Sequence, residues 1–372
     1  MVESESESDA QRGATRGSRP SMREVASLAG VSIATVSYAI RSPSRVSATT
    51  REKVQRAIDD LGFVVNSAAR SMRTGGTPGM GVVVGDLSHS FSVGVVRGAQ
   101  AGARDSGATM LIANADRDDW EQSRYIELFD QARLQGIILA PLDESRAEIA
   151  RLREHGSPVV VVNYRSGADD HCTVLMDNDD VGYRAADHLI SLGCRRLVFA
   201  TGYARAQPLH ERRHGIERAV ADRDGVGLDV LMRERVDAED GRAIARRILA
   251  TPLEARPDGV IAATEIMALG LLQELAAEGV RVPEDMLLIS TEEDWRAVDA
   301  PVRISRLKEP AFEMGRQAAV LLADEIANPE THRHRTVTLA ATLFAAESTL
   351  GRGAPTVEES PSQSHERPAA NS

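Results

Sequence analysis

The sequence predicts an α/β protein in which a small all-α domain precedes a two-lobed core of parallel sheets flanked by helices. Between residues 80 and 346, short and nearly continuous aliphatic runs alternate with amphipathic segments, as in parallel strands joined by crossover helices. Before them, residues 20–64 hold three short helical patterns that begin at capping residues. The core region of about 270 residues exceeds one ordinary domain, so two lobes are expected.

The N-terminal residues 1–19 consist mainly of Ser, Glu and Arg and are expected to be a disordered tail. No charged start is followed by an apolar run, and no stretch approaches the roughly 20 apolar residues of a membrane helix. We therefore expect a cytoplasmic protein.

The first predicted helix begins after Ser21, which together with Glu24 has the spacing of a capping box. Its apolar face is predicted from the i, i+3, i+4 repeat of Val25, Leu28 and Ala29. Gly30 then permits a sharp turn.

The second predicted helix begins after Ser32, a capping residue. Its inward face is predicted to consist of Val36, Ala39 and Ile40, which leaves Ala34, Ser37, Tyr38 and Arg41 on the outward side. Two helices joined by a turn with Gly, the second with small and polar residues outward, are typical of a helix-turn-helix that enters a major groove. This spacing alone leaves open a helical hairpin within a core.

A third helix is predicted after Ser47, with one apolar face and a stop at Gly62. That face consists of Val54, Ala57, Ile58 and Leu61. Residues 20–75 carry net charge +4 in a chain of net charge −11, which leaves −15 for the remainder. A basic module on an acidic protein favours binding to a phosphate backbone.

The stretches AGVSIATVSYAI, RVSATTREKVQRAIDDLGF and NSAARSMRTG resemble, in this order, the DNA-binding headpiece of the LacI/GalR (lactose repressor-like) transcription regulators. The resemblance implies a helix-turn-helix domain over residues 20–64 and a hinge helix and linker over residues 65–79. In the family the hinge helix forms on operator DNA and inserts an apolar residue into the minor groove. Met72 stands where Leu is usual, and Val65 where Pro is common before the capping Asn66.

The resemblance further implies a repressor that binds a palindromic operator as a homodimer under control of a small-molecule effector, without enzymatic activity or a cofactor. Ile33, Ala34, Ser37 and Tyr38 would face base edges, and Thr35 and Thr50 would hold phosphates. The expected DNA-binding residues are Ser32, Ile33, Ala34, Thr35, Ser37, Tyr38, Arg41, Thr50, Asn66, Ala69 and Met72.

The aliphatic runs of the core are predicted to be strands covered on both faces. They are residues 80–85, 109–113, 136–140, 159–163, 196–200, 259–263 and 287–290. The resemblance implies a core, over residues 80–350, that is similar in fold to periplasmic sugar-binding proteins and clamps a small molecule between its lobes. Residues 351–372 are expected to be a second disordered tail.

Ligands of open parallel sheets bind beyond the carboxyl ends of the strands. The expected effector-binding residues are therefore Asp86, His89, Ser90, Phe91, Asn163, Arg212, Thr264, Glu265 and Glu292. By resemblance, Arg212 stands where the family commonly has an Arg that contacts the effector. For each of the others, capping of the following helix is the alternative role.

Three departures from the family's pattern leave the identity of the effector open. Thr264-Glu265 replaces Asn-Asp, Glu292-Glu293 replaces Asp-Asp, and residues 89–92 replace Asn-Pro-Phe-Phe. Glu is one methylene longer than Asp, so its carboxylate cannot occupy the same place without moving the ligand. A specificity for sugars or purines is therefore not inferred from the family. The alternatives are a ligand unlike either and a regulator that has lost effector binding.

The stretch His210-Glu211-Arg212-Arg213-His214 matches H-E-x-x-H, which on a helix could bind zinc. A zinc hydrolase or a metal-binding protein is therefore an alternative. Against it, Arg212 and Gly215 are in register with the family's Arg-x-Arg-x-x-Gly segment, and no third ligand follows at a recognisable spacing. The two cysteines, Cys172 and Cys194, have no metal-binding spacing and are expected to be reduced structural thiols, so no metal site is predicted.

Overall fold

The computed structural model describes residues 20–41, 45–63, 77–141, 145–202, 206–297, 299–351 and 353–359. The chain divides into two compact units, residues 1–75 and 76–372. Within the described ranges, no helix is long and apolar enough to cross a membrane.

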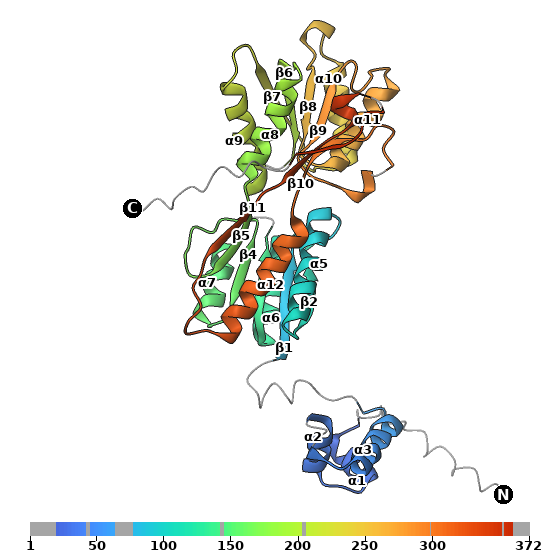
Figure 1. Cartoon of the computed structure of the whole chain (residues 1–372), viewed down its shortest axis with the longest axis vertical. Coiled ribbons are helices and arrows are strands. Elements are labelled where there is room, and N and C mark those ends of the chain that lie inside the picture. The colour runs from blue at the N-terminus through green and yellow to red at the C-terminus, as the bar shows by residue number, and fades with distance from the viewer. Residues whose placement is uncertain are drawn as a thin grey trace, which may run out of the picture. The chain divides into compact units, whose positions relative to one another are not determined.

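The described residues of the first unit form the helices α1 (Met22–Ala29), α2 (Ile33–Arg41) and α3 (Ala48–Leu61) (Figure 1). Ser21 and Glu24 form the predicted capping box, and Gly30 ends α1 in the left-handed conformation. Val36 and Ala39 of α2 pack against Val54 and Ala57 of α3, as expected.

The predicted apolar face of α1 is wrong at one position. Leu28 is 55% exposed, and Ala26 is buried beside Val25 instead. Met22, Val25, Ala26 and Ala29 all belong to the core of this unit, so the buried face is centred near Ala29. Because successive helix positions are about 100° apart, Leu28 lies at the rim of that face.

The second unit has two lobes, each built around one sheet (Figure 1). The sheet of the first lobe has the order β11-β5-β4-β3-β1-β2, and all of its neighbouring strands are parallel. Its strands are β1 (Thr77–Val84), β2 (Thr109–Asn114), β3 (Leu134–Ala140), β4 (Val159–Val162), β5 (Cys172–Met176) and β11 (Thr336–Leu339).

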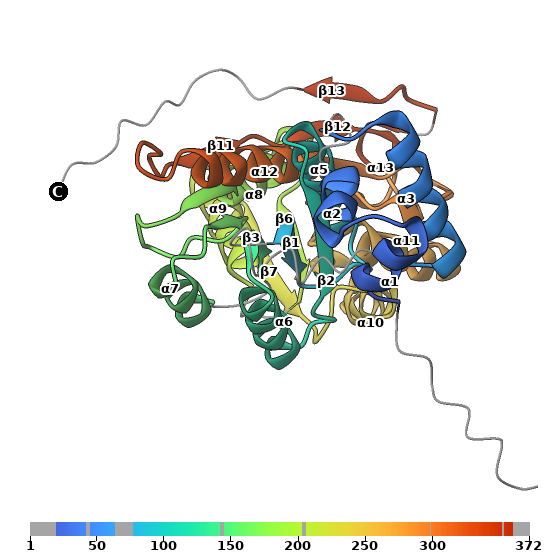
Figure 2. The same ribbon diagram turned by 90° about the horizontal axis from the view of Figure 1, so that it is seen from below.

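Helices cover both faces of this first sheet. Figure 2 shows α5 (Ser90–Asp105) and α12 (Ala311–Ala327) on one side, with α6 (Asp119–Gln131) and α7 (Arg146–Glu154) on the other. Val82 and Val84 of β1 belong to the core cluster of α5 and α12, whereas Val83 belongs to that of α6 and α7. Alternate residues of one aliphatic run thus pack against helices on opposite faces of the sheet. Both sets of residues are buried, which explains why the run is continuously apolar.

The edge strand β2 departs from the prediction of strands covered on both faces. Leu111 and Ile112 are each about 40% exposed, because β2 pairs only with β1 at the end of the sheet. An exposed apolar edge strand is a surface on which another chain can pair.

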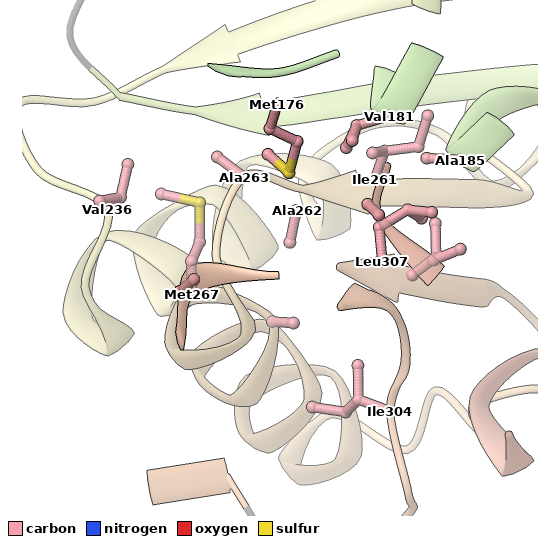
Figure 3. Close-up of a cluster of buried hydrophobic side chains, with 14 of the residues drawn as sticks. Met176, Val181, Ala185, Val236, Ile261, Ala262, Ala263, Met267, Ile304 and Leu307 are labelled. Carbon is pink, nitrogen blue, oxygen red and sulfur yellow. The ribbon is translucent and has the colours of Figure 1, made fainter. Parts of the chain in front are cut away.

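The second sheet has the order β13-β12-β10-β9-β8-β6-β7. Its strands are β6 (Arg196–Thr201), β7 (Gly227–Met232), β8 (Gly259–Ala262), β9 (Leu287–Ser290), β10 (Ser305–Lys308), β12 (Thr342–Ala345) and β13 (Val357–Glu359). The strands from β7 to β10 are parallel, and β12 and β13 are antiparallel additions. Its helices are α8 (Asn178–Ser191), α9 (Gln207–Ala221), α10 (Ala238–Leu249), α11 (Glu265–Ala277) and the short α13 (Glu347–Leu350). Figure 3 shows part of its core, where Ile261 and Met267 lie near Met176.

Two predicted boundaries are wrong. Residues 357–359 were expected in the disordered tail, but they pair with β12 as strand β13, and the Glu359 carbonyl accepts a hydrogen bond from Arg184. The linker was expected to extend to residue 79, but β1 begins at Thr77. Pairing with a neighbouring strand decides both boundaries, and sequence composition does not reveal it.

Among the described elements, the chain passes between the lobes from β5 to α8, from β10 to α12 and from β11 to β12. β10 belongs to the second sheet and β11 to the first, and Figure 1 shows both strands next to the junction of the lobes. Side chains close to these crossings can therefore change their contacts when one lobe moves against the other.

Candidate functional site

Part of the predicted outward face of α2 is exposed. Ile33 and Tyr38 are 45% and 49% exposed, and Ala34 is also exposed. Large apolar and aromatic side chains on the surface of a small domain indicate a contact surface. Ser37 is partly buried.

The starts of α2 and α3 have the same polar arrangement. Ser32 Oγ accepts a hydrogen bond from Thr35 N at 3.1 Å, and the two hydroxyl oxygens are 2.8 Å apart. Ser47 and Thr50 repeat this at the start of α3, at 3.2 and 2.8 Å. Exposed helix starts of this kind attract phosphate groups.

Several predicted DNA-binding residues lie outside this description. Asn66, Ala69 and Met72 are not among the described residues, and Arg41 is described only as the last residue of α2.

In the second unit, Arg212 is placed by close packing of α8 and α9. A Cβ atom added at Gly182 of α8 would lie 1.9 Å from the Arg212 carbonyl oxygen, and one at Gly215 would lie 1.9 Å from the Asp179 carbonyl oxygen. The two glycines therefore allow the helix backbones to touch. This contact brings the Arg212 side chain to the start of α8.

The Arg212 side chain is 1% exposed and is held by four side chains from three segments. Its Nε donates to Asn178 Oδ1 at 3.1 Å. Nη1 donates to Thr291 Oγ1 at 3.2 Å and to Glu292 Oε1 at 2.7 Å, and Nη2 donates to Glu309 Oε1 at 2.6 Å. We call Arg212, Asn178, Thr291, Glu292 and Glu309 the Arg212 cluster.

Two carboxylates share this one buried guanidinium, and their pKa values reflect it. Burial by itself lowers the pKa of Arg212, but Glu292 and Glu309 reverse that effect and raise it. Burial, followed by the charge of Glu292, raises the pKa of Glu309, and Arg212 only partly opposes the rise. The cluster therefore holds one negative charge more than Arg212 balances when both carboxyl groups are ionised.

The Arg212 cluster lies where the lobes meet. Asn178 Nδ2 donates to Asn163 Oδ1 at 3.0 Å, and Asn163 follows β4 of the first lobe in the left-handed conformation. Arg165, two residues further on, contacts Glu211 of α9 at 3.4 Å. The structure thus brings together three of the predicted residues: Asn163 and Glu292 follow β4 and β9, and Arg212 lies within α9 and reaches Asn163 through Asn178.

A second group of side chains also links the lobes, and we call its members Asp294, Ser90, Glu265 and Arg296 the Asp294 cluster. Asp294 interacts through its side chain with Ser90 at the start of α5, and its backbone N donates to Glu265 Oε2 at 2.6 Å. Arg296 forms an ion pair with the Asp294 carboxylate. Although burial raises the pKa of Asp294, the hydrogen bonds from Arg296 lower it below its ordinary value.

Burial raises the pKa of Glu265 in this cluster to about 7, and the hydrogen bond from Asp294 N only partly opposes the rise. Glu265 is therefore close to half-protonated at neutral pH. A carboxyl group in this state can donate or accept a hydrogen bond.

The remaining predicted effector residues have local partners. Thr264 caps α11, accepting from Met267 N and donating to the Val236 carbonyl at 2.6 Å. Asp86 accepts from Ser88 N and lies 3.5 Å from His89. The Phe91 ring packs against the hydrophobic core. For Thr264 the capping alternative describes what the structure contains.

Asn178, Glu309 and Asp294 belong to these clusters but were missed from the sequence. Asn178 follows β5 and Glu309 follows β10, neither of which was recognised as a strand, because CTVLM is short and SRLK is largely polar. If those strands had been recognised, the carboxyl-end rule would have indicated both residues.

The H-E-x-x-H stretch lies on α9, and two of its three motif side chains have other partners. His214 pairs with Asp179, Glu211 accepts from Asn178, and His210 is exposed. Within the described ranges, no third ligand joins His210 and His214. The zinc-hydrolase alternative is therefore not favoured.

Comparisons with known proteins agree with both units. A model of the bacterial regulatory proteins of the lacI family matches residues 21–66, and one of a periplasmic binding protein-like domain matches residues 186–349. The HTH-type transcriptional repressor PurR of Vibrio campbellii is 27% identical over 311 residues, which cover 83% of this chain and 92% of that protein. The repressor CytR of Escherichia coli is also 27% identical over 311 residues, 82% of this chain and 89% of that protein.

Solved structures are similar over most of the chain. A transcriptional regulator CelR–cellobiose complex is 29% identical, with a TM-score of 0.65 over 89% of this chain and all of that chain. The lac repressor dimer bound to operator is 19% identical, with a TM-score of 0.76 over 90% of this chain and all of that chain. The second likeness concerns the fold alone.

The Arg212 cluster generates a prediction about stability. Arg212→Met should lower the free energy of unfolding by about 3 to 5 kcal/mol, because it leaves two carboxylates without their buried partner. Adding Glu309→Gln should recover at least about 1 kcal/mol, since it removes the most buried of these charges. Chemical denaturation of the single and double variants measures this, and equal stability of the two would contradict it.

Glu265 generates a prediction about pH. Its folded-state pKa of about 7 exceeds the ordinary 4.5, so the folded protein retains a proton that the unfolded chain loses as pH rises. Its contribution to stability is therefore complete below pH 4.5 and is lost as pH rises through 7. Glu265→Gln keeps the acceptor for Asp294 N, so it should match the wild type at pH 5 and exceed it by about 1 to 3 kcal/mol at pH 8. Denaturation curves at both pH values check this, and a constant difference between the two proteins argues against it.

Proposed function

Because this chain belongs to the LacI/GalR family of DNA-binding transcriptional repressors, we propose that it binds a palindromic operator as a homodimer. In this proposal a small molecule lowers or raises its affinity for the operator. The observation that carries the DNA-binding role is the helix-turn-helix unit with an exposed face on α2. Members of this family are regulators and not enzymes.

The proposed contacts to bases come from α2. Ile33 and Ala34 offer only apolar contacts, such as to a thymine methyl group, while the Tyr38 hydroxyl can donate or accept one hydrogen bond. Ser37 and, by resemblance to the family, Arg41 are proposed to contribute further contacts. Thr35 and Thr50, at the starts of α2 and α3, are proposed to hold phosphates, because their hydroxyls lie at the amino-terminal ends of these helices.

The proposed hinge contacts follow from the family resemblance. Asn66 would cap the hinge helix, and Ala69 and Met72 would face the minor groove, with the Met72 side chain inserted between base pairs.

Two exposed edge strands support the proposed homodimer. β2 ends the first sheet and β7 ends the second, and both leave one side of the strand without a neighbour in their sheet. Leu111 and Ile112 of β2 and Met232 of β7 are large apolar side chains with substantial exposure. An association along these edges would bury them and place two headpieces on one DNA.

The proposed effector site is the Arg212 cluster with Asn163 and the Asp294 cluster. Asn163 and Ser90 belong to the first lobe and their partners Asn178 and Asp294 to segments packed on the second, so a ligand that replaces these hydrogen bonds would change the position of one lobe against the other. The two clusters contain four carboxyl groups and two guanidinium groups, which favours a hydroxyl-bearing or positively charged compound.

A second candidate function is a repressor that responds to no effector. The Arg212 guanidinium, which would bind an effector by resemblance to the family, is already held by Glu292 and Glu309. An anionic ligand would have to displace both carboxylates.

The DNA-binding proposal predicts different effects for two variants on α2 and α3. Sequences selected from a random duplex library should be palindromic. Tyr38→Phe should weaken binding to the selected operator by about 5- to 100-fold and leave scrambled DNA unaffected, because only a base contact is lost. Thr50→Val should weaken binding to both, since phosphate contacts are independent of sequence. Wild-type protein that binds all duplexes equally would refute the proposal.

The effector proposal predicts a thermal shift. At least one hydroxylated or cationic metabolite should raise the melting temperature of the full chain and change its operator affinity, because a ligand stabilises the state that it binds. Asn163→Ala should reduce that shift, and Ser106→Ala, at the opposite end of α5 from Ser90, should not. If no compound acts on either property, the effector-free alternative is preferred.

A further inference from the structure

A thiol and two imidazoles come together at the amino ends of β5 and β11. Cys172 is the first residue of β5, and His332 and His334 lie in the segment between α12 and β11. Cys172 Sγ is 3.2 Å from His332 Nε2 and 4.0 Å from His334 Nδ1. All three ligand atoms lie within 4.8 Å of one another. It is the sole such group found within the described part of the chain.

These separations fit the edges of a small coordination polyhedron. With Zn–S and Zn–N bonds of about 2.3 and 2.0–2.1 Å, sulfur and nitrogen ligands of a tetrahedral zinc ion lie about 3.6 Å apart. The two observed sulfur-to-nitrogen distances lie on either side of that value. Small side-chain rotations would therefore suffice to place one ion between the three atoms.

His332 is oriented as a metal ligand usually is. Its Nδ1 lies 2.7 Å from Asp324 Oδ2, so the ring directs Nε2 towards the Cys172 sulfur. A carboxylate on the second ring nitrogen fixes the tautomer and the orientation of metal-binding histidines. The His332 side chain is almost fully buried, whereas Asp324 reaches the surface.

The surroundings of His334 hold an unused acceptor. Arg153 Nη2 lies 3.1 Å from His334 Nε2, and Arg153 Nη1 donates to Glu325 Oε1 at 2.6 Å. Glu325 Oε2 is buried and has no hydrogen-bond partner among the residues that the structure describes. When His334 binds an ion through Nδ1, its Nε2 carries a proton and no longer accepts from Arg153. Glu325 Oε2 can then accept the released Arg153 N–H group, which makes that ion pair bidentate.

We propose that Cys172, His332 and His334 bind one zinc ion, with a fourth position open to water. A thiolate with two imidazoles is a ligand set that suits Zn²⁺, and three protein ligands leave a tetrahedral ion with one exchangeable site. The simpler alternative is a hydrogen bond from the Cys172 thiol to His332 that binds no ion.

The location gives the ion a structural consequence. β5 and β11 are neighbouring parallel strands, and both lead into crossings between the lobes. The ion would fasten the segment after α12 to the start of β5. The Arg212 cluster lies beyond the other end of β5, about 16 Å away along five residues of strand, so the two sites are separate.

The test uses the full chain after removal of metal with a chelator. Titration with Zn²⁺ should show one ion per chain and a raised melting temperature. Co²⁺ in place of Zn²⁺ should give the near-ultraviolet absorption of a cobalt–thiolate bond. Cys172→Ser should abolish that absorption, whereas Cys194→Ser, which changes the other buried thiol, should retain it. Asp324→Asn should weaken zinc binding by about 10- to 100-fold.

Three results would overturn the proposal. They are the absence of stoichiometric zinc binding, a cobalt spectrum that is unchanged in Cys172→Ser, and loss of binding in a His210→Ala, His214→Ala double variant. The last would assign the ion to the α9 motif instead. Operator binding by metal-free Cys172→Ser shows that this variant is folded, and His334→Gln provides a second test of the same site with the thiol intact.

Discussion

The buried positive charge of Arg212 is the constraint on which the arrangement of the lobes depends. A guanidinium taken out of water must be matched by acceptors, and here they come from the segments that follow β5, β9 and β10. Two of these segments are also crossings between the lobes. Any movement of the lobes must therefore preserve or exchange the hydrogen bonds of this one side chain.

The glycines of α8 and α9 make this arrangement possible. Arg212 reaches Asn178 because Gly182 and Gly215 let the two helices touch. A larger residue at either position would separate the helices and leave Arg212 without Asn178. The close packing of α8 and α9 and the position of the Arg212 charge thus depend on the same two glycines.

The two units also differ in the sign of their net charge. Residues 20–75 are basic and the remainder is acidic, so the phosphate backbone of DNA attracts one unit and repels the other. This asymmetry favours an orientation in which the three-helix unit faces the duplex. In the proposed reading of the DNA sequence, Ile33 and Ala34 of α2 offer apolar contacts, and Ser37 and Tyr38 offer hydroxyl groups.

The elements whose information is local could be predicted from the sequence. The capping residues, the glycine turn and the aliphatic runs predicted the three helices and seven of the strands, because caps and burial on two faces leave a direct pattern. Arg212 was singled out by its resemblance to the family's Arg-x-Arg-x-x-Gly segment. Edge strands such as β13 and short polar strands such as β10 were missed, because neighbours in the sheet stabilise them. Only the tertiary structure placed Glu309 beside Arg212 and His332 beside Cys172, since residues about 100 and 160 positions apart meet through the topology of the sheets, which no local spacing records.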